Sequence, residues 1–527
     1  MLLVQAWRTA SGPASDAADA VLFRDALRRS GAAVTAPPAR QHGQCFSSLS
    51  NRNVGKLQET HRRFSAAAAE GGTLLRGHKP AASDGQGRSS SPHNSAYSWV
   101  QCHGGYGMDG AKHAAMRTCH FKNVCFRPKT SEFEYYAHPH LDPPVAFTNN
   151  SVGPLGSLKQ HVYITPSKWG YVQPQWLPHS FKSVPGPVPV APRAVWSPKQ
   201  VTVVYEDASG GNYGHFIGDT LLGLFWVQSV FGLASANNQV VTIGNPASTI
   251  PWFKRLYGLV APGVSEFPVL TMSRMADFNA AGYTEGETEL LCFENLLAGN
   301  GKLEFQRDDG EFTGFGSVYV DFRNFVLCNF GLDPTLHDAA RHVHGKGPHP
   351  IQSHVITYYQ HSGRRQPQRF AEAIEMIRKA FPSVQVDMLD VHASQKAQLQ
   401  QMQRSTVFVA GNGGGSFGGL FLPEGSAAIV FDNSDSVRSV RFGGEARMWS
   451  NLPTVRDLYY PVLDEDVVIP HDPEAAKLRY IYDFQRIRLV PCRLARLVGD
   501  ALNHASFTFN LPFVDEQGSH LDELCPS

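Results

Sequence analysis

The chain has 527 residues, of which 42% are hydrophobic and 11% aromatic, and its 47 Lys and Arg residues against 46 Asp and Glu give a formal net charge of +1. This length and composition are typical of a globular protein with roughly two to four structural units, each able to bury a core. The charge balance excludes binding to nucleic acid or anionic lipid through bulk electrostatics, so a charged ligand must bind at a local site.

Residues 1–95 differ in composition from the rest of the chain. They are rich in Ala, Ser, Gly and Arg, and they include "SAAAAEGG" and "GQGRSSS" with no sustained apolar period. We expect a disordered segment or a targeting leader. No window approaches the run of about 18 apolar residues that a transmembrane helix needs, so no membrane anchor is visible in this chain.

The eight cysteines favour an oxidising compartment. Three of them lie with three histidines in one stretch, at Cys102, His103, His113, Cys119, His120 and Cys125. This spacing lacks the C-x-x-C pair of structural zinc sites, so we expect disulfides or buried thiols there. Asn149 begins an N-x-S/T sequon, which is compatible with glycosylation in the lumen of the secretory pathway.

From about residue 200 the chain alternates between predicted strands and helices. The apolar and β-branched stretches "QVTVVYED" and "NQVVTIGN" predict strands. The stretches "HFIGDTLLGLFWVQSVFG" and "IPWFKRLYGLV" carry apolar residues at helical intervals. A β-α-β-α order implies a mostly parallel sheet with helices on its faces.

The same alternation begins again near residue 353. Strands are predicted at "HVITYYQ", "VQVDML" and "TVFVA", and helices at "QRFAEAIEMIRKAF" and "SQKAQLQQMQR". The simplest account is an α/β protein with two Rossmann-like domains. We expect the first domain at 96–345, the second at 346–460, and a C-terminal closing segment at 461–527.

A glycine-rich turn, "GNGGGSFGGLFLPEG", follows the strand "TVFVA". Gly413, Gly415 and Gly418 have the spacing G-x-G-x-x-G, but a dinucleotide fingerprint belongs to the first β-α-β turn, and this turn follows the third strand. No Lys-Ser or Lys-Thr pair closes it as in a P-loop. The remaining functional interpretation is a row of backbone N–H groups that binds a diphosphate. The alternative is a tight connection in which glycine supplies only backbone freedom.

The residues predicted to bind the diphosphate lie at the carboxyl edge of the second sheet. Arg364 and Arg365 follow its first strand, where guanidinium groups can bind phosphate oxygens, although a solvated basic turn is the alternative. The glycine-rich turn supplies the others, which are Asn412, Gly413, Gly414, Gly415 and Ser416.

The stretch "GNYGHFIGD" contains a candidate catalytic pair. His215 and Asp219 stand four residues apart at the start of a predicted helix, so they share one face and the carboxylate can orient the imidazole as a general base. Asn212 is expected to cap this helix rather than to take part in the chemistry. The alternative is a helix start with a purely structural role.

No metal site is predicted. A protein that holds a diphosphate through a cation usually has a D-x-D motif, and "DED" at Asp464–Asp466 and "RDDG" at Asp308 and Asp309 lie in polar stretches that are typical of exposed turns. We therefore expect neither a metal ion nor another cofactor.

Two of these motifs together resemble glycosyltransferase family 61, which includes the EGF-domain O-GlcNAc transferase and plant xylan xylosyl- and arabinosyltransferases. "FVAGNGGGSFGGLFLPEGSAAIVF" looks like the family's carboxy-terminal motif, and Asn212, His215 and Asp219 match its N-x-x-H-x-x-x-D helix start. "CFENLLAGNG" and "FRNF" are further similarities. The resemblance covers about residues 95 to 500, with the motifs in the family's order.

The resemblance implies a GT-B arrangement, in which two Rossmann-like domains face each other across a cleft. It further implies inverting, metal-independent transfer of GlcNAc or a pentose such as xylose from a UDP-sugar to a hydroxyl of a glycan or glycoprotein, in the Golgi or endoplasmic reticulum. Asn412 replaces the family's usual His, and a strand-ending Arg of the family is absent. These departures leave open a catalytically weak carbohydrate- or nucleotide-binding protein of the same fold.

Overall fold

The chain divides into two compact units, Met1–Gln44 and Cys45–Ser527, and every residue that can be described belongs to the second. The expected leader at 1–95 lies outside the described residues. The computed structural model describes residues 97–103, 118–137, 180–205, 214, 216–242, 263–267, 269–272, 274–299, 316–334, 351–360, 366–411, 414–431, 452, 454–466, 487–514 and 519–525.

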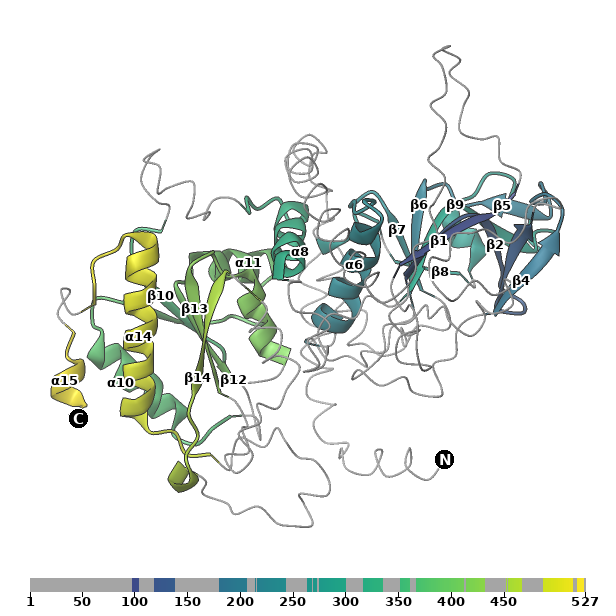
Figure 1. Ribbon diagram of the computed structural model, residues 1–527. Coiled ribbons are helices and arrows are strands. Elements are labelled where there is room, and N and C mark those ends of the chain that lie inside the picture. Colours follow the sequence, from purple (N-terminus) through teal and green to yellow (C-terminus); the bar gives the residue numbers. More distant parts are fainter. Residues whose placement is uncertain are drawn as a thin grey trace, which may run out of the picture. The chain divides into compact units, whose positions relative to one another are not determined.

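The described residues form a mixed α/β structure with two sheets (Figure 1). The first sheet has the strand order β4-β3-β2-β9-β6-β7-β8, and β1 and β5 pair with β2 and β9. Its strands are β1 (Trp99–His103), β2 (Thr118–Arg127), β3 (Glu132–Ala137), β4 (Ser180–Pro185), β5 (Ala194–Trp196), β6 (Val201–Tyr205), β7 (Gln239–Thr242), β8 (Leu270–Thr271) and β9 (Leu290–Gly299).

The first sheet is mixed rather than wholly parallel. Strands β9, β6, β7 and β8 run parallel to one another, as the alternation after residue 200 predicts. Strand β2, in contrast, pairs antiparallel with β1, β3 and β9. The disulfide Cys125–Cys292 joins directly opposite residues of β2 and β9, and Cys119 is also disulfide-bonded, which confirms the expected disulfides.

The second sheet is wholly parallel, with the order β11-β10-β12-β13-β14. The strands predicted at "HVITYYQ", "VQVDML" and "TVFVA" are confirmed, and so are the two predicted helices, α10 and α11. The elements are β10 (Val355–Tyr358), α10 (Phe370–Ala380), β11 (Gln385–Met388), α11 (Gln395–Arg404), β12 (Val407–Gly411), η9 (Gly414–Phe421), β13 (Ser426–Phe431) and β14 (Val455–Tyr460).

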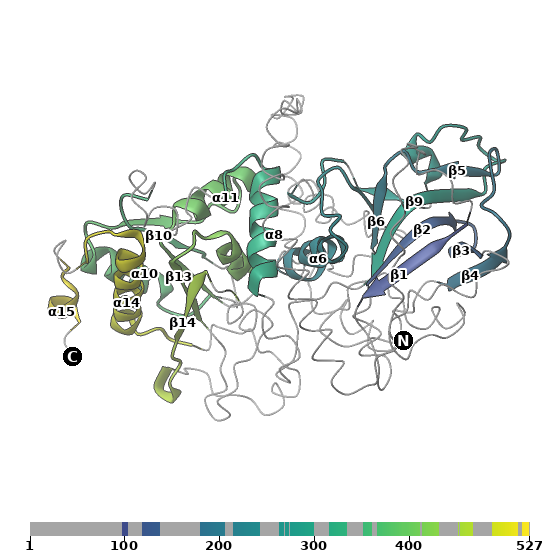
Figure 2. The same cartoon turned by 45° about the horizontal axis from the view of Figure 1, so that its top comes forward.

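Helices cover both faces of the second sheet (Figures 1 and 2). Successive strand residues point to opposite faces. In β12, Val407 and Val409 therefore pack with α10 and with helix α14 (Pro491–Phe509), whereas Phe408 and Ala410 pack with α11 and η9. This double coverage explains why β12 and β13 are buried along their whole length and read as continuous apolar runs.

Helix α8 (Gly316–Asn329) links residues of the two halves in one hydrophobic core. It packs against helix α6 (Leu222–Val230), with the rings of Phe225 and Phe325 5.1 Å apart between centroids. It also packs against η9, where Phe322 and Phe421 are 6.4 Å apart. The "GNYGHFIGD" segment, hereafter the first motif, and the glycine-rich turn thus contribute to a single core, through Ile217 and Phe417.

The C-terminal closing segment is attached to the second sheet. Helix α14 packs on β13, β14 and α10. The disulfide Cys492–Cys525 fastens α15 (Leu521–Leu524) to the start of α14. The 3₁₀ turn η10 (Asp464–Asp466) and the short η7 (Met275–Phe278) complete the list, with η4 (Phe216–Leu221) described below.

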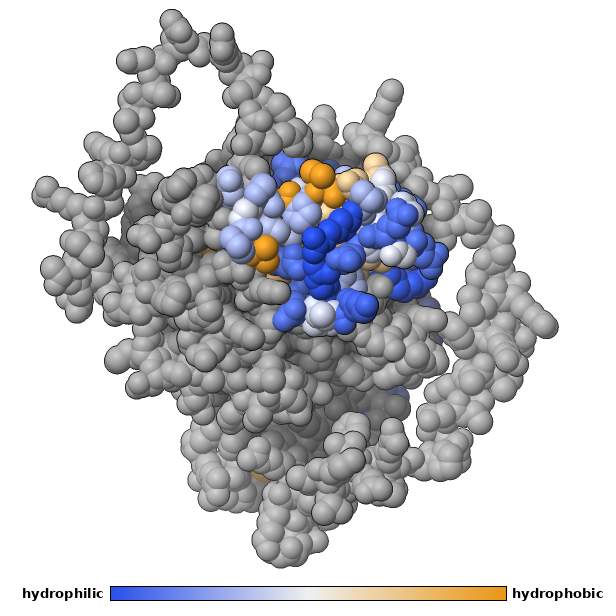
Figure 3. Space-filling model, turned by 90° about the vertical axis from the view of Figure 1, so that its right-hand side faces the viewer, coloured by the Kyte–Doolittle hydropathy of each residue, from blue (hydrophilic) through white to orange (hydrophobic). Residues whose placement is uncertain are grey.

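The surface visible in Figure 3 is mostly hydrophilic where the residues are described, and hydrophobic residues appear on it only in small groups. Large contiguous apolar patches usually mark interaction surfaces, and the described residues on this face show none. Within the described segments, no helix has the length and apolar character needed to cross a bilayer.

Candidate functional site

The second sheet changes direction in its strand order between β10 and β12. Strand β11 lies on one side of β10, and β12, β13 and β14 follow on the other side. In open α/β sheets, ligands bind at such a switch point, outside the carboxyl ends of the two strands. Here those ends are Tyr358, which is followed by Tyr359, and Gly411, which leads into the glycine-rich turn.

Tyr359 explains why position 415 has no side chain. The backbone N–H of Tyr359 donates to the Val409 carbonyl oxygen at 2.8 Å, which fixes Tyr359 beside β12. A Cβ added to Gly415 would lie 2.1 Å from Cε1 of the Tyr359 ring, far inside van der Waals contact. The ring and the turn are therefore packed together at the switch point.

The two sequence motifs meet through their glycines. A Cβ on Gly214, in "GNYGHFIGD", would lie 2.7 Å from the Cα atom of Gly414 and 2.9 Å from the Phe417 ring. Gly214 and Gly414 are 200 positions apart in the sequence. The backbone at Gly214 therefore lies against Gly414, the first residue of η9.

The first motif continues as a π-helical turn, η4, and not as the ordinary α-helix that was expected. Asp219 lies within this turn, and α6 follows it. Turns of this type have i→i+5 hydrogen bonds, so the four-residue spacing of His215 and Asp219 does not have its simple α-helical meaning. Single π-turns inside helices occur frequently at functional sites.

The structure describes only part of the predicted site. Gly414, Gly415 and Ser416 lie together in η9, and Ser416 is fully buried. For Asp219 the backbone is described but the side chain is not. The other predicted site residues lie outside the described residues, namely Asn212, His215, Arg364, Arg365, Asn412 and Gly413.

Arg323 adds a buried cation close to the end of the glycine-rich turn. Its side chain, on α8, is 6% exposed, and its Nη1 donates to the carbonyl oxygen of Leu422 at 3.2 Å. Its Nε and Nη2 donate to Oδ1 of Asn324. The sequence contained this residue only as part of "FRNF", and no spacing rule indicates that the arginine contacts the segment after η9.

The "DED" stretch is a turn with an exposed Glu465, as expected, but Asp466 within it is buried. Asp466 is 1% exposed, and its Oδ2 accepts hydrogen bonds from the backbone N–H of Leu463 at 2.9 Å and from Nη1 of Arg493. The Arg493 guanidinium also lies over the Tyr460 ring. Asp466 therefore has a structural partner, and the described segments contain no group of three or more His, Cys, Asp or Glu that could hold a metal.

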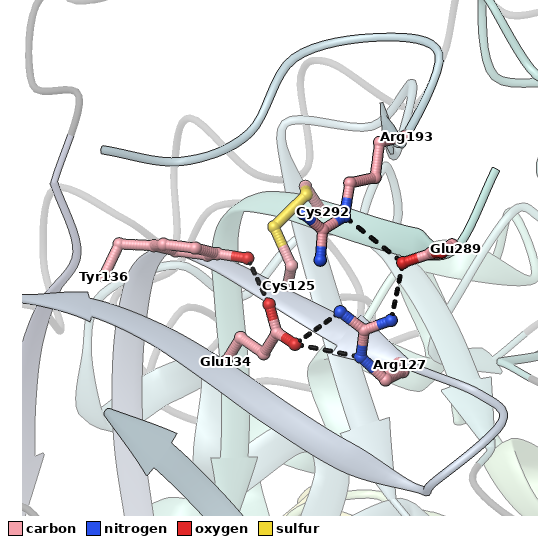
Figure 4. Close-up of polar contacts among 7 residues, drawn as sticks. All are labelled: Cys125, Arg127, Glu134, Tyr136, Arg193, Glu289 and Cys292. Atoms are coloured by element: carbon pink, nitrogen blue, oxygen red, sulfur yellow. Dashed lines mark hydrogen bonds and ion pairs between the residues drawn. A yellow bond between two sulfur atoms is a disulfide. The ribbon is translucent and has the colours of Figure 1, made fainter. Parts of the chain in front are cut away.

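A polar cluster on the first sheet has its partners within the protein (Figure 4). Glu134 accepts from Nη2 of Arg127 at 2.7 Å and from the Tyr136 hydroxyl at 2.6 Å, and Arg127 also pairs with Glu289. Burial and the hydrogen bond to Glu134 raise the pKa of Tyr136, so its hydroxyl remains a donor. Such a satisfied network beside the Cys125–Cys292 disulfide stabilises the sheet.

No protein-family model matches the chain, and no curated protein sequence matches it significantly. The site is therefore defined by its geometry. The switch point joins a row of glycines, a tyrosine ring and the backbone of the "GNYGHFIGD" motif. Backbone N–H groups at the start of a helix can bind an anion.

Proposed function

We propose that the chain is an inverting glycosyltransferase of the GT-B type, which transfers GlcNAc or a pentose such as xylose from a UDP-sugar to a hydroxyl of a glycan or glycoprotein. One observation carries the proposal. The glycine-rich turn starts at the carboxyl edge of the β10/β12 switch point and is in contact with Gly214 of the "GNYGHFIGD" motif. A donor bound at the turn would therefore lie next to the residues proposed for proton transfer.

The proposed donor site would use the turn to hold the diphosphate. Backbone N–H groups between Asn412 and Ser416 would donate to phosphate oxygens, and Arg364 and Arg365 would supply charge from the loop after β10. These groups would stabilise the departing UDP without a metal ion. The ion pair between Asp466 and Arg493 supports this proposal, because it engages the "DED" carboxylate in the fold.

The proposed chemical step needs a base on the acceptor side. His215 would remove the proton from the acceptor hydroxyl as that oxygen attacks the anomeric carbon, and the bond to UDP would break on the opposite face. Asp219 would orient the imidazole and stabilise its charged form. Asn212 would stabilise the start of the same segment.

The disulfides support a place for the protein in the lumen of the secretory pathway. Cys125–Cys292 and Cys492–Cys525 are both formed, and structural disulfides persist mainly in oxidising compartments. The Golgi and the endoplasmic reticulum also hold nascent glycoproteins, which are the proposed acceptors.

A binding protein of the same fold is the second candidate. Tyr359 and Gly214 fill the space beside Gly415 and Gly414, so two glycines of the turn have a packing reason that needs no ligand. Asn412, in place of the family's His, favours the same candidate. Such a protein would bind a sugar nucleotide or a glycan without turning it over.

A panel of radiolabelled UDP-sugars distinguishes the two candidates. The wild-type chain is expected to transfer or slowly hydrolyse one donor, and to do so in excess chelator. His215→Ala should lower turnover about 100-fold to 10,000-fold while UDP affinity, measured by calorimetry, stays close to that of the wild type.

Three results would count against the proposal. Retention of a donor without any turnover would favour the binding protein. Activity that chelator abolishes and manganese restores would contradict the metal-independent mechanism. Near-normal turnover of His215→Ala with a lowered melting temperature would make the first motif structural.

A further inference from the structure

Two neighbouring groups leave no room for a side chain at Gly214. One neighbour is the Phe417 ring, whose Cε2 and Cδ2 atoms would lie 2.9 and 3.0 Å from an added Cβ. The other is the Cα atom of Gly414, at 2.7 Å. A ring can rotate or shift, but a Cα atom moves only with its backbone. Any side chain at position 214 must therefore displace either the first motif or the glycine-rich turn.

We infer that Gly214 is a positioning residue of the proposed transfer site, an inference that rests on the proposed function. Gly214 directly precedes His215, the proposed base, and Gly414 belongs to the turn that would hold the donor. The missing side chain lets these two backbone segments touch, and this contact sets the distance between base and donor. A displacement of about 1 Å between reacting groups commonly lowers a rate about a hundredfold.

The two neighbours of Gly214 provide a way to separate positioning from simple packing. Phe417→Leu shortens the side chain that meets the new Cβ, but it leaves the Gly414 backbone in place. If Gly214 only fills space, combining Gly214→Ala with Phe417→Leu should restore stability and turnover together. If Gly214 positions the motif, turnover should stay low in the double variant, because the contact with the Gly414 backbone is still blocked.

The experiment compares Gly214→Ala, Phe417→Leu and the double variant with the wild type. For Gly214→Ala we expect kcat to fall about a hundredfold with UDP affinity changed by less than about threefold. The double variant should regain at most the part of the melting temperature that the Phe417 ring contact accounts for, and it should not regain the kcat of the wild type. Gly418→Ala is the matched control, since its Cβ would meet Phe408, Leu389 and Met402 only at 3.7 to 3.9 Å, which is ordinary contact.

The outcomes separate this inference from the proposed function. A wild-type chain that transfers no sugar refutes the proposed function, and with it the positioning role. An active wild type whose Gly214→Ala variant keeps its kcat refutes the positioning role alone. Recovery of kcat together with melting temperature in the double variant also refutes it. If Gly214→Ala does not fold, the double variant and Phe417→Leu carry the comparison.

Discussion

His354 is a buried imidazole that joins the second sheet to α14. It is 3% exposed, and its Nε2 lies 2.9 Å from the Ser506 hydroxyl and its Nδ1 3.4 Å from the Thr406 hydroxyl. Burial lowers the pKa of His354 to about 4, against a weaker opposing contribution from the Pro512 carbonyl. The side chain therefore stays neutral in the folded protein at pH values where it is protonated in the unfolded chain.

This difference predicts acid sensitivity. Between the folded pKa of about 4 and the unfolded value of about 6.5, the unfolded chain binds more protons, so the stability that His354 contributes is complete above about pH 6.5 and is lost as the pH falls toward 4. From about pH 7.5 to about pH 5 the free energy of unfolding should fall by about 2 kcal/mol on this account. His354→Gln should show a smaller fall in urea unfolding, whereas the exposed His392→Gln should behave like the wild type. Equal falls in all three proteins would exclude His354 as the cause.

Single glycines show what the sequence predicts and what it leaves out. The seven glycines of the turn indicate that something approaches its backbone, and the sequence interpretation assigned that space to a diphosphate. At Gly415 the neighbour is the Tyr359 ring, and at Gly214 it is Gly414. Neither contact follows from local spacing, because each joins segments that only the folded chain brings together.

At the scale of elements, periodicity predicts those that bury one face. In α10 the residues Phe370, Ile374 and Ile377 recur at helical intervals and are buried as expected. Strand β9 shows no alternation in "LLCFENLLAG", because both of its faces are buried, with Leu291 and Phe293 in one hydrophobic core and Leu297 in another. The sequence therefore indicated the second sheet well, but not the antiparallel pairing of β2 with β1, β3 and β9.

The connection between η10 and α14 allows a prediction about the "DED" stretch. Asp466→Asn should lower the free energy of unfolding by about 2 to 4 kcal/mol, because it leaves the largely buried Arg493 without its closest carboxylate. Glu465→Gln is the matched control. The Glu465 side chain also pairs with Arg493, with Oε1 3.5 Å from Nη2, but it is 67% exposed. Such exposed pairs contribute at most about 1 kcal/mol to the free energy of unfolding. Urea unfolding measures both. A similar small loss in the two variants would show that the buried pair is not a stabilising contact.

At the scale of the whole molecule, the disulfides Cys125–Cys292 and Cys492–Cys525 cross-link distant parts of the chain. Cys492–Cys525 spans 33 positions. Removing a disulfide that closes a loop of that size should lower the free energy of unfolding by about 3 to 4 kcal/mol. We expect this from urea unfolding of the chain with Cys492→Ser and Cys525→Ser combined. Reductant should then destabilise the wild type more than this double variant. An unchanged unfolding midpoint in the variant would show that the link adds nothing to the folded state.

The pairing of β2 with β9 has a consequence for synthesis of the protein. Cys125 and Cys292 are 167 positions apart. In the sheet, β2 lies between β3 on one side and β9 on the other. At a translation rate of about 5 to 20 residues per second, Cys125 waits roughly ten to thirty seconds before its partner is made. During that interval the edge of β2 that later pairs with β9 has no partner strand. The Cys125 thiol is then free to form a disulfide with another cysteine. The Cys125–Cys292 disulfide can therefore form only after β9 has been made, and we expect a nascent chain stopped before residue 292 to carry a mispaired or unreacted Cys125.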